Sequence, residues 1–148
     1  MELEKQLCSL ELAKKLKELG VKQESFWYWT ILPSSPRLCS KFEIEDECSR
    51  GLFEVKVFSA FSVAELGELL PKIIVDKYGQ QWWLELHNER GYKDEQGRTV
   101  KWAHENIWQV AYANVGLVSA ETEADSRATM LILLLEGESG ECSARGKT

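Results

Sequence analysis

The chain has 148 residues, of which 44% are hydrophobic and 28% are charged, a composition close to that of folded domains and far from that of disordered segments. Its formal net charge of −6 repels phosphate backbones, so we do not expect nucleic-acid binding. The longest apolar run, residues 130–135, is too short to cross a bilayer, and the first 20 residues lack the apolar centre of a signal peptide. The composition predicts one soluble domain without a membrane segment.

The cysteines are far apart in the sequence, at Cys8, Cys39, Cys48 and Cys142. No two of them have the C-x₂₋₄-C spacing of a structural zinc site, and a disulfide framework is not indicated. We therefore expect free thiols in a reducing cytoplasm, and neither a metal nor a cofactor.

A leucine stripe at helical spacing predicts a first helix, and Gly20 is typical of a helix end. An upstream leucine stripe projects from the opposite side. Either the chain breaks at Ser9 and the helix restarts, or the upstream stripe contacts a neighbouring molecule; we favour the break. The first stripe is Leu12, Leu16 and Leu19, and the upstream stripe is Leu3, Leu7 and Leu10.

The next segments have the composition of strands. Residues 26–32 are aromatic and β-branched and precede a proline- and serine-rich turn at residues 33–36. Residues 41–44 are predicted to form a short strand, and residues 52–58 alternate apolar and charged side chains. Turn residues between these two segments predict an antiparallel hairpin.

A second helix is predicted by Ser62 and Glu65, which match a capping box, and it ends at Pro71. Gly67 inside this helix indicates close packing, because glycine otherwise costs about 1 kcal/mol relative to alanine. Further strands are predicted at residues 81–87 and 107–113 and, more weakly, at 99–103, with a polar loop at 89–98.

The final helix begins at Thr122, which with Asp125 matches a helix cap. Its main apolar stripe is about 100° wide, but Met130, Leu133 and Leu134 extend the apolar surface beyond that stripe. We therefore expect burial on more than one side. The predicted domain comprises residues 1–136, and residues 137–148 are predicted to form a flexible C-terminal tail.

The histidines, His87 and His104, lack the companions of a catalytic or metal site, so a cleft beside either is a minor hypothesis. The aromatic residues are more informative. Trp27 and Trp29 share one face of a strand, whereas Trp82 and Trp83 face opposite ways. Core packing explains most of these residues, and an interaction surface is the main alternative. The candidate surface consists of Trp27, Trp29, Trp82, Trp83 and Leu133.

Three stretches together resemble a group of small proteins encoded by bacterial phages and prophages, a group with no assigned function. The stretches are LKELGVKQESFWYW, FSAFSVAELGELLP and TEADSRATMLILLLE, and the likeness spans residues 16–136. The chain departs from the group around residues 33–36 and in the cysteine-containing segment that follows. The resemblance implies a phage origin and the cytoplasm of a bacterial host, and it supplies no catalytic or ligand-binding residues.

These observations predict an α+β fold with a mainly antiparallel sheet of four to six strands, two or three helices and the C-terminal helix packed on the sheet. The favoured function is a non-enzymatic interaction protein that self-associates or binds a protein partner through aromatic and apolar side chains. One alternative is an acidic inhibitor of a basic host or phage protein. The other is a small enzyme or ligand-binding domain with a cleft near His87 or His104.

Overall fold

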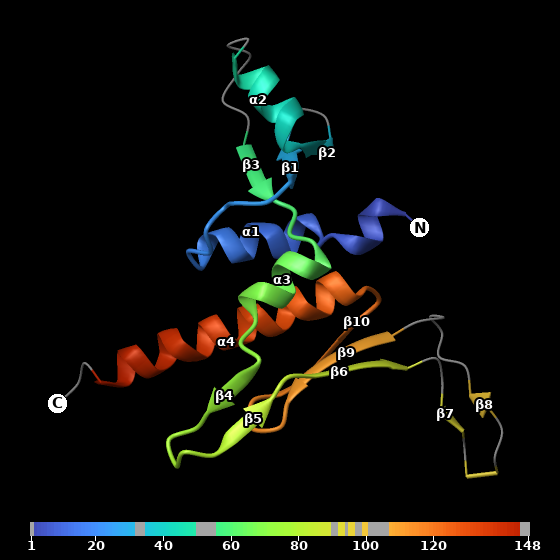
Figure 1. Cartoon of the computed structure of the whole chain (residues 1–148), viewed down its shortest axis with the longest axis vertical. Coiled ribbons are helices and arrows are strands. Elements are labelled where there is room, and N and C mark those ends of the chain that lie inside the picture. Colours follow the sequence, from blue (N-terminus) through green and yellow to red (C-terminus); the bar gives the residue numbers. More distant parts are fainter. Residues whose placement is uncertain are drawn as a thin grey trace.

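The computed structural model describes residues 2–31, 35–49, 56–89, 92–93, 95–96, 99–100 and 107–145. Three helices lie in the middle of the molecule, and strands lie on either side of them (Figure 1). The α+β class, the antiparallel pairing of the strands and the contact of the C-terminal helix with strands are confirmed. The three helices are α1 (Leu10–Glu18), α3 (Val63–Leu69) and α4 (Glu123–Arg145).

The N-terminal strands form one antiparallel sheet with β1 (Trp27–Ile31) at its centre. β2 (Pro36–Ser40) pairs with one edge of β1, and β3 (Lys56–Ser59) pairs with the other. The strand predicted at residues 41–44 and its hairpin with residues 52–58 are wrong. Residues 41–44 instead belong to helix α2 (Lys41–Ser49), and the second edge strand is β2.

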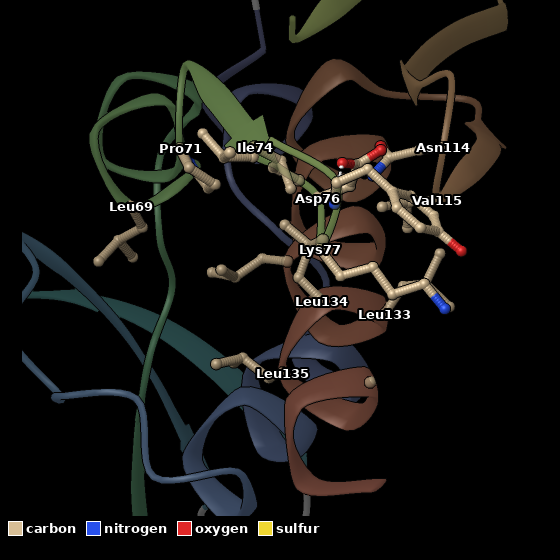
Figure 2. Close-up of a pocket in the computed structure, with 14 residues that line it drawn as sticks. Leu69, Pro71, Ile74, Asp76, Lys77, Asn114, Val115, Leu133, Leu134 and Leu135 are labelled. Carbon is tan, nitrogen blue, oxygen red and sulfur yellow. Dashed lines mark hydrogen bonds between the residues drawn. The ribbon is translucent and has the colours of Figure 1, made fainter. Parts of the chain in front are cut away.

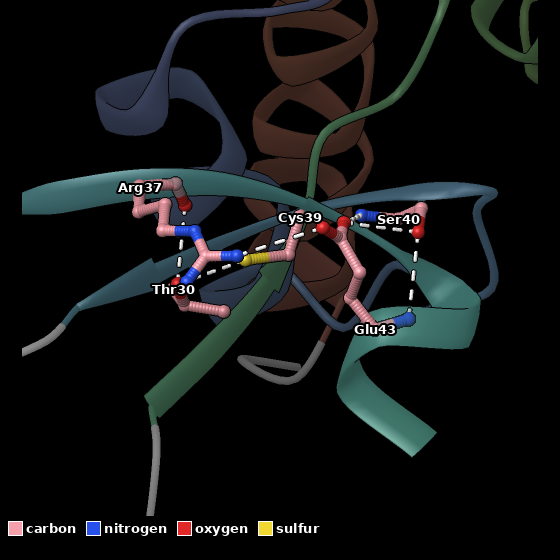
Figure 3. A network of polar contacts seen from close by, with 5 residues as sticks. All are labelled: Thr30, Arg37, Cys39, Ser40 and Glu43. Atoms are coloured by element: carbon pink, nitrogen blue, oxygen red, sulfur yellow. Dashed lines mark hydrogen bonds and ion pairs between the residues drawn. The ribbon is translucent and has the colours of Figure 1, made fainter. Parts of the chain in front are cut away.

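Helix α2 forms because its first turn is capped. The backbone N–H of Glu43 donates to Ser40 Oγ at 3.4 Å, and the backbone N–H of Ser40 donates to Glu43 Oε2 at 2.7 Å. These reciprocal bonds make a capping box, a motif present in the sequence as S-x-x-E. Arg37 Nη2 lies 3.5 Å from Glu43 Oε1 and ties the helix to β2 (Figure 3).

The remaining strands form separate small sheets. The predicted strand at residues 81–87 is two strands, because the chain leaves one sheet for another at Leu84. The strand predicted at 107–113 is confirmed, and residues 92–93 of the predicted loop at 89–98 form a short strand. Residues 101–106, which include part of the segment predicted at 99–103, lie outside the described residues. The sheets are β4 (Ile73–Val75) with β5 (Gln81–Trp83), β6 (Glu85–Glu89) with β9 (Ile107–Tyr112) and β10 (Gly116–Ala120), and β7 (Tyr92–Lys93) with β8 (Thr99–Val100).

The break predicted at Ser9 is confirmed. A short 3₁₀ helix, η1 (Leu3–Gln6), precedes it, and α1 starts directly after Ser9. The Ser9 side chain makes no cap hydrogen bond, but the Ser9 backbone N–H donates to Asp125 Oδ1 at 2.7 Å. The start of α1 is thereby fixed to the first turn of α4. Gly20 has a φ of 85°, the left-handed conformation expected after α1.

Helix α4 supplies much of the core. Its N-terminal half contacts α1, α3, β9 and β10, and Thr122 Oγ1 accepts the backbone N–H of Asp125 at 3.1 Å as predicted. The helix continues to Arg145, whereas the sequence prediction ended it at Glu136. Gly67 of α3 faces a side chain and not the close backbone neighbour that was expected, since a Cβ there would lie 2.6 Å from Arg127 Nη1 of α4. The α4 side chains buried in the core are Ala124, Ala128, Met130, Leu131 and Ile132.

Helices α3 and α1, which start after Ser62 and Ser9, give a matched test of capping. Ser62 Oγ accepts the Glu65 backbone N–H at 3.3 Å, whereas the Ser9 side chain caps nothing. Ser62→Ala should therefore lower the free energy of unfolding by about 1 kcal/mol, while Ser9→Ala should change it by much less. Urea denaturation followed by circular dichroism measures both. Equal losses in the two variants would contradict the capping account.

Candidate protein-docking groove

An open groove of about 930 Å³ lies beside residues 131–137 of α4. Three segments line it: residues 69–78, the turn between β9 and β10 at Asn114 and Val115, and residues 131–137 of α4 (Figure 2). The lining is mostly aliphatic. A groove of this kind suits apolar side chains of another chain better than a small polar ligand.

Helix α4 forms the floor of the groove. Met130 and Leu131 are buried in the core, and Leu134 is half-buried, whereas Leu133 remains 38% exposed. The sequence prediction that the helix has more apolar surface than one layer can cover therefore holds at Leu133 but not at Met130. The described residues leave Leu133 open to solvent.

The rim is a tight turn between β4 and β5 that Asp76 organises. Its Oδ1 accepts the backbone N–H groups of Tyr78 at 2.8 Å and Gln80 at 3.0 Å, and its Oδ2 accepts Trp82 Nε1–H at 3.1 Å. Gly79 has a φ of 80°, which this turn requires. The Trp82 bond is the main reason that the pKa of Asp76 lies below its ordinary value, with the two backbone bonds adding to it.

The turn places Tyr78 on the groove wall with 79% of its surface exposed. Lys77 Nζ lies 5.0 Å from the centre of the Tyr78 ring, a cation–π contact. Both charged groups of the rim thus already have partners in the described structure. Asp76 is held by three donors, and Lys77 lies over an aromatic ring.

An exposed apolar face of the β4–β5 hairpin adjoins the groove. Ile73 lies opposite Trp83 in the register, and Val75 lies on the same face of β4. Trp83 is 63% exposed. Val75 also lines the groove, so the face and the groove form one region, which we call the apolar surface. Its exposed members are Leu69, Ile73, Val75, Tyr78, Trp83, Val115 and Leu133.

The five predicted surface residues do not come together. Trp83 and Leu133 belong to the apolar surface, and Trp82 is half-buried on the inner face of the hairpin. Trp29 packs against the core and donates from Nε1 to the Cys8 carbonyl oxygen at 2.9 Å. Trp27 is half-buried beside the Phe26 ring, with 5.5 Å between ring centres. The N-terminal tryptophans are therefore separate from the groove.

Sequence reasoning missed most of the hairpin. Residues 73–75 are three consecutive β-branched side chains, and Asp76 and Gly79 supply turn chemistry before the tryptophan pair. That combination is a hairpin signal. This signal would have placed Ile73 opposite Trp83 and Tyr78 in the connecting turn.

Reactive groups in the described residues do not form a site. His87 is exposed, with Nε2 3.4 Å from Glu85 Oε2, and it does not line the groove, while His104 lies outside the described residues. Cys8 and Cys39 are free and buried, and burial raises the pKa of the Cys8 thiol to about 12. That thiol is therefore uncharged at neutral pH and a poor nucleophile.

The hydrogen bonds of Asp76 lead to a testable prediction about the pKa of its carboxyl group. Trp82→Phe removes the donor that most favours the ionised Asp76 carboxylate, so the pKa of Asp76 should rise toward its ordinary value. Because the folded-state pKa is lowered, this carboxylate contributes stability above its ordinary pKa and loses it as the pH falls through the lowered value. NMR titration of the Asp76 side chain gives the pKa in both proteins. An unchanged pKa in Trp82→Phe would show that the indole does not set it.

The described side chains form an exposed apolar surface, and no catalytic constellation is recognisable among them. They contain no group of three or more histidine, cysteine or acidic residues that could hold a metal ion. Among the helices they form, none has the length and apolar character needed to cross a membrane. Comparisons with known protein families, with curated proteins and with solved structures found no match for this chain.

Proposed function

We propose that this chain is a non-enzymatic interaction protein that docks another polypeptide on its apolar surface. The observation that carries the proposal is Leu133, which stays exposed in the floor of a groove although its neighbours Leu131 and Ile132 are buried. Exposed apolar side chains gathered around a concave floor are typical of protein-binding sites.

The size of the apolar surface supports this proposal. Its seven side chains together present on the order of 700 Å² to solvent. The largest apolar patch on a typical monomer is roughly 300–600 Å². Covering the surface with another chain would remove it from water and so favour association.

The polar groups of the groove support a polypeptide rather than a small metabolite. A metabolite site needs polar groups that converge on the ligand. Here the Asp76 carboxylate already accepts bonds from Tyr78, Gln80 and Trp82, and Lys77 lies over the Tyr78 ring. The groove offers a second molecule aliphatic and aromatic contact beside the polar groups of residues 76–78 and Asn114.

The test compares Leu133 with Phe42, which is 67% exposed on α2, away from the groove. Each is replaced in turn by a benzophenone-bearing amino acid, and cells producing the full chain are irradiated. We expect covalent adducts with a polypeptide from position 133 and not from position 42. Mass spectrometry identifies the adduct. No adduct at 133, or equal adducts at both positions, would overturn the proposal.

A further inference from the structure

Strand β4 has one paired edge and one open edge. In its antiparallel pairing with β5, the backbone N–H of Leu84 donates to the Lys72 carbonyl at 3.0 Å, and that of Asp76 donates to the Gln80 carbonyl at 2.9 Å. Hydrogen-bonded pairs alternate in such a ladder, so Ile74 and Trp82 form the bonded pair between them. The N–H and C=O groups of Ile73 and Val75 therefore point away from β5.

The three residues of β4 carry no charged side chain, proline or bulge on the open edge, although the strand is short and Pro71 and Lys72 precede it. Exposed edges are normally blocked by a charged side chain, a proline or a bulge within the strand. β4 consists of two isoleucines and a valine, and no other described strand pairs with it. Two residues of β4 thus present outward donors and acceptors beside the apolar surface.

The charges at the two ends of β4 select the direction of pairing. Lys72, which is exposed, precedes the strand, and Asp76, which is half-buried, follows it. If two copies of β4 pair antiparallel about Ile74, Lys72 of each copy lies opposite Asp76 of the other. In a parallel arrangement in register, Lys72 would face Lys72. Opposite charges directly across two strands stabilise the pair, and like charges destabilise it.

We infer that a second copy of this chain is the polypeptide that docks beside the apolar surface, through antiparallel pairing of the two β4 edges about a two-fold axis at Ile74. In this register Ile73 of each copy lies opposite Val75 of the other. Each of these two pairs exchanges two backbone hydrogen bonds, which gives four in all. The two β4–β5 hairpins then form one four-stranded sheet that crosses the axis. This inference rests on the proposed docking function.

A second copy needs apolar area beside the pairing edge, and a standard stable interface buries roughly 800 Å² per partner. Ile73, Val75 and Trp83 lie on a face of the enlarged sheet that edge pairing leaves open. The area that a second copy can cover is therefore that of the groove side chains, Leu69, Tyr78, Val115 and Leu133. A two-fold axis uses every contact twice, so a modest patch in each copy suffices for a closed dimer.

Two proline variants test the edge directly. Val75→Pro removes an N–H that points to the open edge of β4, whereas Gln81→Pro removes the equivalent N–H on the far edge of β5, and neither N–H belongs to the β4–β5 ladder. In sedimentation equilibrium of the full chain, we expect the unaltered protein and Gln81→Pro to be dimeric and Val75→Pro to be monomeric. Circular dichroism checks that both variants are folded.

A charge variant keeps the inference testable if either proline disturbs folding. Lys72→Glu places a carboxylate opposite Asp76 of the other copy at two sites and should weaken dimerisation about tenfold. The reference variant is Lys22→Glu, at an exposed site on a different segment, which should leave dimerisation unchanged.

A monomeric unaltered chain, a dimer that survives Val75→Pro, or equal weakening by the two lysine variants would overturn the inference. If the unaltered chain is monomeric while position 133 crosslinks to a different polypeptide, the docking function stands and the second copy is excluded. If it is monomeric and position 133 crosslinks to nothing, both proposals fail.

Discussion

Burial of the N-terminal half of α4 is the constraint on which the rest of the structure depends. Side chains from α1, α3, β9 and β10 pack against it, and Ser9 donates to Asp125 in its first turn. Each large aliphatic side chain enclosed there contributes roughly 1.5–3 kcal/mol relative to exposure. Tyr112 of β9 is fully buried in the same core, and its hydroxyl donates to the Pro71 carbonyl oxygen, which fixes where the chain leaves α3. The position of the β4–β5 hairpin follows from that contact.

The limited extent of this covering leaves the apolar surface exposed. The elements that cover α4 end near Pro71 and Val115, while the apolar side chains of the helix continue to Leu135. The hairpin approaches α4 from one side only, and Asp76 holds its turn at the rim of the groove. The core and the proposed interface are therefore successive parts of one apolar helix face. The open edge of β4 beside them gives a second chain backbone partners as well as apolar contact.

The sequence predicted those elements whose signals are local. The capping box at Ser62, the cap at Thr122 and the left-handed Gly20 placed α3, the start of α4 and the end of α1. Prediction failed at residues 41–44, where the strand-like composition was given more weight than a local capping signal. Residues 41–44 had strand composition, but the capping bonds of Ser40 and Glu43 started a helix.

The candidate site was predicted only in part, because only some of its residues follow from local periodicity. Leu133 and Trp83 followed from helical and strand periodicity, because each lies on the face opposite a buried neighbour. Trp29 was misplaced, since its indole N–H reaches the Cys8 carbonyl across the core, and no local pattern signals that bond. The open edge of β4 could not be derived without the register, which depends on which of its residues pair with Trp82 and Trp83.

Amide hydrogen exchange along β4 tests the central claim most directly. Ile74 donates within the hairpin, whereas the N–H groups of Ile73 and Val75 point to the open edge. The account predicts that the Ile73 and Val75 amides exchange fast in dilute protein and become protected as concentration rises, while Ile74 is protected throughout. Fast exchange at Ile73 and Val75 at every concentration, in a chain that also stays monomeric, would contradict it.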